Sequence, residues 1–261
     1  LTWGFGPYMA ISVFDPNNPV RADLGLRLKA DYHITPNWVL SGAITKKLQG
    51  NLDGDTDPVP SPLPRVRTDY ANYSAFGDPA IEHLTLTRFG RIGENVYSRV
   101  TLGYLESMYA GVSGELLWKP IDSRLALGAE LNYAKQRAYD QMFGLRDYDT
   151  VTGHVSAYYE LARGFHTQVD VGRYLAGDYG ATIALDREFA NGWSIGAYAT
   201  FTDVPFDDFG EGSFDKGLRF TIPLGWFLGT PSRQTNSVSI QSLTRDGGAR
   251  LKINDRLYQR V

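Results

Sequence analysis

The chain has 261 residues, of which 26 are basic and 29 acidic, and it contains no cysteine. The near balance of charge removes the electrostatic case for nucleic-acid binding, and the lack of cysteine excludes disulfides and thiolate metal ligands. No stretch approaches the ~18 consecutive apolar residues of a membrane-spanning helix, which excludes a helical membrane protein. A membrane β-barrel stays open, because only every second residue of a barrel strand faces lipid.

Short alternating runs, 28 glycines and an aromatic content of 13% predict an all-β chain. In 124–137, for example, Leu127 and Leu131 share one face, whereas Glu130 and Asn132 share the other. Taken in chain order, about fourteen strands are predicted, near residues 3–14, 20–32, 37–48, 81–89, 95–106, 109–118, 123–137, 148–161, 165–175, 178–189, 193–203, 214–224, 236–244 and 249–256.

The connections between these strands alternate between two kinds. The longer segments 49–80, 138–147 and 204–213 fall on one side, and mostly tight turns fall on the other, with 225–235 as an exception. All five tryptophans lie on the side of the tight turns: Trp3, Trp38, Trp118, Trp193 and Trp226. A membrane interface favours this placement, since an indole ring buries in the acyl boundary while its N–H stays hydrated.

Two folds accommodate the alternation. In a soluble sandwich the apolar face forms the core, whereas in a membrane barrel the apolar face meets lipid and the polar face lines the lumen. Strands of this length, the unequal loops and the tryptophan belt favour a transmembrane antiparallel up-and-down β-barrel. We expect residues 1–261 to form one such domain.

The polar faces of these strands define the candidate lumen. The charged and aromatic side chains that we expect to line it are Asp23, Arg27, Lys29, Asp31, Arg99, Glu115, Arg124, Glu130, His154, Tyr158, His166, Asp170, Asp186, Glu188 and Arg219. Because both signs are present, two interpretations stay open: a hydrated path for a sugar chain, or a lumen packed shut by its own ion pairs. The aromatic and acidic loops 138–147 and 204–215 are either ligand contacts or an inward plug.

Enzymatic and metal chemistry find little support in the residues. Strands 148–161 and 165–175 are expected to form a hairpin in which Ser156 lies opposite Asp170, and His166 opposite Glu160. A serine–histidine–acid set could be built there, but no nucleophile motif accompanies it. The acidic run 53–57 lacks the downstream spacing of a helical calcium-binding motif, and His154 and His166 lie in rows that do not face each other. We expect neither a catalytic site nor a metal or cofactor.

Four segments carry a family resemblance. They are GYLESMYAGVSGELLW from Gly103, GAELNYAKQRAYDQMFGLRDYDTVTGHVSAYY from Gly128, GRYLAGDYGATIALDREFANGWSIGAYATFTD from Gly172 and FGEGSFDKGLRFTIPL from Phe209. Over roughly 96–224 the chain resembles the YjbH/GfcD-like family of outer-membrane exopolysaccharide and capsule biosynthesis proteins. The resemblance implies the C-terminal barrel portion of a longer protein. The chain ends in Val261, so either the insertion machinery reads an internal strand or the last residues are not the final strand.

These observations together predict a non-enzymatic barrel of the bacterial outer membrane that takes part in exopolysaccharide or capsule export or assembly. Its expected partners are membrane lipid, a polysaccharide and the periplasmic proteins of an exopolysaccharide operon, with no nucleic acid. Two alternatives are kept: a structural barrel that scaffolds periplasmic partners without conducting, and an outer-membrane hydrolase.

Overall fold

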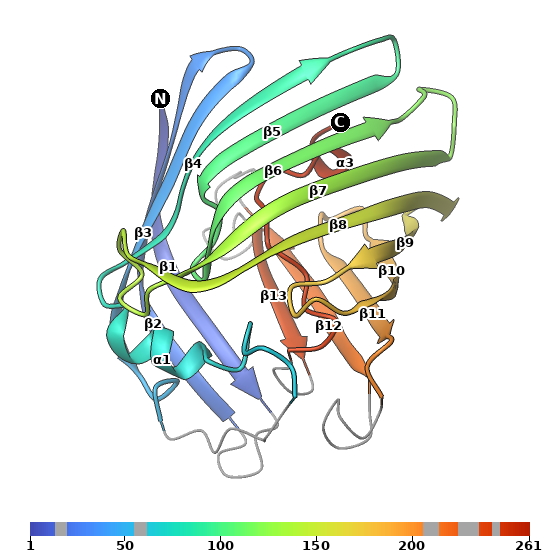
Figure 1. The fold of residues 1–261 in the computed structure, drawn as a ribbon. Coiled ribbons are helices and arrows are strands. Elements are labelled where there is room, and N and C mark those ends of the chain that lie inside the picture. The colour runs from blue at the N-terminus through green and yellow to red at the C-terminus, as the bar shows by residue number, and fades with distance from the viewer. Residues whose placement is uncertain (14–19, 55–61, 206–213, 224–234, 242–245) are drawn as a thin grey trace.

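The structure is a computed structural model that describes residues 1–13, 20–54, 62–205, 214–223, 235–241 and 246–261. Thirteen strands form one antiparallel sheet in which each strand pairs with the next along the chain (Figure 1). The strands are β1 (Thr2–Val13), β2 (Val20–Thr35), β3 (Trp38–Gly50), β4 (Ala80–Arg91), β5 (Val96–Tyr104), β6 (Tyr109–Trp118), β7 (Leu125–Arg137), β8 (Leu145–Ala162), β9 (Phe165–Arg173), β10 (Tyr179–Glu188), β11 (Ser194–Thr202), β12 (Asp215–Pro223) and β13 (Thr235–Gln241).

The predicted all-β, up-and-down order is confirmed, and each of these thirteen strands overlaps a predicted one. The fourteenth prediction, 249–256, is wrong. This stretch has no strand and leads into the short helix α3 (Leu257–Arg260). A second helix, α1 (Tyr70–Phe76), lies within the connection 49–80.

The alternation of each strand sets which side chains meet the outside. Along β7, exposed and buried residues alternate, so that Leu127 and Leu131 are exposed while Glu130 and Asn132 are buried. Among the described residues, the largest fully buried side chains begin with three arginines, Arg21, Arg99 and Arg137. A soluble sandwich would seal its leucines between two sheets, whereas this single sheet exposes them and buries charge.

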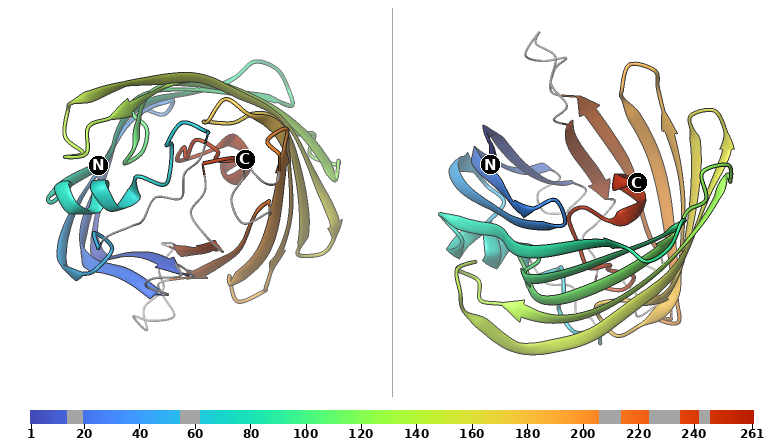
Figure 2. Two further views of the ribbon diagram at one scale, coloured as in Figure 1. Left: turned by 60° about the horizontal axis from the view of Figure 1, so that its bottom comes forward. Right: turned by 90° about the horizontal axis from the view of Figure 1, so that it is seen from above.

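The sheet curls around an interior, so that it has a convex and a concave face (Figure 2). Within the described residues, no strand pairing joins β1 to β13, the two ends of the order. The expected closed barrel is therefore not completed by paired strands. The stretch 249–256, predicted as the last strand, lies instead on the concave side, as does the C-terminus (Figure 2).

The two rims of the sheet differ as the sequence predicts. Trp3 and Trp38 lie at the start of β1 and β3, Trp118 ends β6, and Trp193 precedes β11, so these four tryptophans share one rim. Trp226 lies outside the described residues. We call this side the tryptophan rim and the opposite side the long-loop rim. No described helix is long and apolar enough to cross a membrane.

Candidate functional site

Part of the concave face of the sheet is covered by the last residues of the chain, 246–261, which we call the C-terminal segment (Figure 1, red). It enters from the long-loop rim, where the Asp246 carboxylate accepts backbone N–H bonds from residues 66–68 at 2.7–3.1 Å. The Leu175 N–H then donates to the Ala249 carbonyl at 2.9 Å. These bonds anchor the segment to two connections of the same rim.

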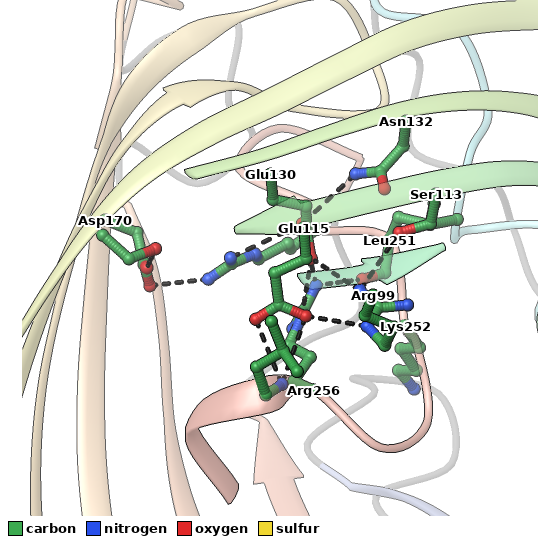
Figure 3. A network of polar contacts seen from close by, with 12 residues as sticks. Arg99, Ser113, Glu115, Glu130, Asn132, Asp170, Leu251, Lys252 and Arg256 are labelled. Atoms are coloured by element: carbon green, nitrogen blue, oxygen red, sulfur yellow. Dashed lines mark hydrogen bonds and ion pairs between the residues drawn. The ribbon is translucent and has the colours of Figure 1, made fainter. Parts of the chain in front are cut away.

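The concave face of the sheet, which we call the wall, carries a buried charge network beneath the segment (Figure 3). The Arg99 guanidinium on β5 has no exposed surface and donates to Glu115 on β6 at 2.8 Å, to Thr101 at 2.8 Å and to Ser113 at 3.1 Å. Its second contact with an acid is to Glu130 on β7, at 3.8 Å. A buried arginine needs such partners, because an unpaired charge away from water is strongly disfavoured.

The C-terminal segment adds two more guanidinium groups to this network. Arg250 contacts Asp170 on β9 at 2.7 Å and Glu130 at 3.5 Å. Arg256 donates twice to Glu130, at 2.9 and 3.1 Å, and once to the Leu251 carbonyl at 2.9 Å. Burial by itself lowers the pKa of the Arg250 guanidinium, but the carboxylates Glu130 and Asp170 outweigh it and raise the pKa. The segment therefore docks by charge on carboxylates of β7 and β9.

Backbone groups of the segment use the remaining acids. The Lys252 N–H donates to Glu106 at 3.2 Å, and the Leu257 N–H, at the start of α3, lies 3.2 Å from both oxygens of Glu115. A carboxylate at a helix start satisfies an N–H that has no partner within the helix. Desolvation lowers the pKa of the Lys252 amine, and Arg67 lowers it further, although the residue keeps exposed surface.

Apolar clusters lie on both sides of the charge network. Towards the tryptophan rim, Leu257 packs with Leu117, Ala126 and Tyr158, and the Tyr258 ring stacks on Tyr158 with centroids 3.9 Å apart. Towards the long-loop rim, Ala249 and Leu251 join a larger cluster with Val66, Tyr73, Leu105, Met108, Tyr109, Ala134, Leu175 and Ala176. The segment is thus held by two apolar contacts with a charged contact between them.

Most predicted lumen residues lie on the concave face, but the structure divides them into groups. Arg99, Glu115, Glu130 and Asp170 come together in the network just described. Tyr158 lies in the apolar cluster with Leu257, and His154 is buried opposite Glu130. The others form local pairs or stand apart. These are Arg27 with Glu82, Lys29 with Asp31 at 3.4 Å, Asp23 with Lys47 at 3.8 Å, Arg219 with Asp186 at 2.7 Å, half-buried His166, and exposed Arg124 and Glu188 near the tryptophan rim.

The predicted β8–β9 register is confirmed, with Ser156 opposite Asp170 and His166 opposite Glu160. The Ser156 hydroxyl donates to Asp170, so it is the acid and not a histidine that holds the serine. This geometry does not assemble a serine–histidine–acid relay. Among the described residues there is no group of three or more metal-ligating side chains.

Part of loop 138–147, at the long-loop rim, packs inward. In 138–147, the Tyr139 hydroxyl donates to Asp69 at 2.7 Å, and its ring meets Tyr73 of α1 edge-on, whereas Phe143 stays exposed. The Tyr139 ring of this loop therefore packs inward, whereas the exposed Phe143 ring meets Tyr104 edge-on with centroids 5.7 Å apart. Residues 206–213 of the second loop and 55–57 of the acidic run lie outside the described residues.

Sequence reasoning missed the partners that complete the network: Arg250, Arg256, Glu106 and Asp246. A signal was present, because Arg250 and Lys252 alternate with Ala249 and Leu251. The same alternation is typical of a strand, which is what the sequence predicts over 249–256. In the structure the Arg250 guanidinium contacts carboxylates, Ala249 and Leu251 pack in the cluster at the long-loop rim, and Lys252 is exposed.

Comparison with known proteins identifies the family. A family model described as YjbH, exopolysaccharide biosynthesis protein YbjH, matches residues 1–261. The chain belongs to the YjbH family. It is 36% identical over 260 residues to an uncharacterized lipoprotein YjbH of Escherichia coli (strain K12). That match covers 97% of this YjbH-family chain but 37% of the relative, so the chain spans little over a third of that protein's length.

Proposed function

We propose that this YjbH-family chain is a β-barrel of the bacterial outer membrane that takes part, without catalysis, in exopolysaccharide export or assembly. The observation that carries the proposal is the inverted polarity of the sheet. Leucine, valine and isoleucine side chains are exposed along strand after strand, while arginine, glutamate and aspartate are buried. In water such an apolar surface would be a strong aggregation liability, whereas lipid provides the matching solvent.

Two further features support a membrane location. The four described tryptophans share one rim, where an interface would hold their rings. The Escherichia coli relative is named a lipoprotein, which fits an envelope protein associated with a membrane. With the tight turns on the same rim, we place the tryptophan rim at the periplasmic side.

A second candidate is a structural barrel that scaffolds periplasmic partners and does not conduct. The C-terminal segment favours it, since its charged and apolar contacts fill the concave face of β5–β9. The hydrolase alternative is the least supported of the three, because Ser156 bonds directly to Asp170.

The test complements a strain that lacks the full-length protein, in which secreted exopolysaccharide and outer-membrane insertion are both measured. We expect Ser156→Ala to insert and to restore polymer as wild type does. Polymer lost while insertion is normal would overturn the non-enzymatic proposal. A wild-type protein that fractionates as soluble without detergent would overturn the membrane barrel. Current through planar bilayers then separates the conducting from the scaffolding candidate.

A further inference from the structure

The wall charges of the concave face obtain their partners in two different ways. On β2–β4 and β10–β12 the wall neutralises itself, as in the pair Lys29–Asp31 and the pair Arg219–Asp186. On β5–β9 it does not. There Glu130 and Asp170 draw cationic partners from the C-terminal segment, more than a hundred residues away in sequence in the case of Arg256 and Glu130.

Without the segment, this part of the wall would be acidic. Glu115, Glu130 and Asp170 are each at most 7% exposed, and the wall arginine near them is Arg99, which pairs with Glu115 and Glu130. Three carboxylates would then face one guanidinium. Carboxylates enclosed by low-dielectric walls attract cations and repel anions more strongly than carboxylates at an open surface.

A second, independent feature points to a ligand at the same place. His154 on β8 lies directly opposite Glu130 in the sheet register and is 3% exposed. Neither of its ring nitrogens has a hydrogen-bond partner among the described residues, and its ring meets Tyr174 edge-on at 4.7 Å. A buried polar group without a partner is rare, since it forfeits the bonds that it would make in water. The segment therefore covers this site without using all of its hydrogen-bonding capacity.

We infer that the C-terminal segment is a displaceable basic plug, and that the wall beneath it, formed by Glu115, Glu130, Asp170 and His154, binds cationic saccharides. The ligand class follows from the donors that the segment itself presents. Guanidinium N–H groups occupy the carboxylates now, and the ammonium and hydroxyl groups of an amine-bearing sugar offer the same charge and donors. This inference rests on the proposed function for one point, that a polysaccharide reaches the interior.

A thiol reporter tests the plug. These 261 residues contain no cysteine, so Ser113→Cys places a single thiol among them, beside Arg99. The full-length protein is kept in detergent, and any thiol elsewhere in it is removed by substitution. The rates of the Ser113→Cys thiol with a cationic and an anionic methanethiosulfonate of similar size are compared. We expect slow reaction with both when the plug is intact. With Arg250→Gln and Arg256→Gln together, the ratio of cationic to anionic rate should rise at least about tenfold.

Arg260→Gln is the matched control, because Arg260 belongs to the same segment but contacts other groups: its ion pair is with Asp255 at 3.7 Å, and its guanidinium lies 4.0 Å from the centroid of the Phe89 ring. It should leave the ratio unchanged. Should the double variant not fold, Leu257→Ala loosens the plug by removing apolar packing and keeps every charge. We call the double variant, or Leu257→Ala in its place, the opened variant. If its ratio of cationic to anionic rate stays at the wild-type value, or favours the anionic reagent, the inference is overturned.

Saccharide probes then test the ligand class. Glucosamine oligomers should slow labelling of the opened variant severalfold, whereas N-acetylglucosamine oligomers of the same length should not. Equal protection by both, or by neither, overturns the cationic assignment. Because these rates are measured in detergent, failure of the protein to insert into membranes would overturn the proposed function and leave this readout interpretable.

Discussion

Glu130 is the residue on which docking of the C-terminal segment depends most. It accepts two hydrogen bonds from Arg256, lies 3.5 Å from Arg250 and 3.8 Å from Arg99, and is buried. Glu130→Gln keeps the shape but removes the charge that these three guanidinium groups share. Breaking a buried ion pair from one side costs about 3–5 kcal/mol. Since Arg250 retains Asp170, we expect the lower end, about 3 kcal/mol, in the free energy that docks the segment.

Hydrogen–deuterium exchange measures that free energy directly. The Leu257 N–H is protected by Glu115, and a loss of about 3 kcal/mol should speed its exchange by roughly two orders of magnitude, at about 1.4 kcal/mol per tenfold. Glu188→Gln is the control, because it makes the same chemical change at an exposed end of β10 and should change exchange less than about threefold. If Glu130→Gln exchanges no faster than Glu188→Gln, the segment is not held by this network.

Three further predictions follow from other contacts. Leu131→Arg, at the middle of β7 on the convex face, should cost about 2–4 kcal/mol of unfolding free energy in lipid, and a change near zero would mean that this face meets water. Leu257→Ala should lower the free energy that docks the segment by about 2–5 kcal/mol. Hydrogen exchange of the segment amides measures this loss, and the circular dichroism of the sheet should stay unchanged. Burial raises the pKa of Asp178, which accepts the Gly248 N–H; its stabilisation is therefore greatest below its unfolded pKa and declines as pH rises through the folded one. Asp178→Asn should accordingly remove part of the fall in segment protection as pH rises through the folded pKa of Asp178, and an unchanged pH profile would contradict this.

Helix α1, at the long-loop rim, could not be predicted from the local sequence. The prolines and acids of 49–80 predict an irregular connection, yet α1 forms there because Tyr73 is buried, with its hydroxyl donating to the Arg137 carbonyl at 2.7 Å. That bond joins residues 64 positions apart, and no local pattern contains it. Tertiary burial, more than helix propensity, accounts for this helix.

The sequence by itself determined the strands, their neighbours, the β8–β9 register and the tryptophan rim. Each of these depends on a period of two residues or on the next segment of the chain, which is why alternation alone was sufficient. Only the tertiary structure decided that the last strand-like stretch enters the concave side. The alternation of Ala249 and Arg250 fits both a sheet strand and a segment on the concave side. The contacts of Arg250 with Asp170 and Glu130 decide between the two positions. These acids lie far from the segment along the chain, so a local sequence pattern does not reveal the contacts.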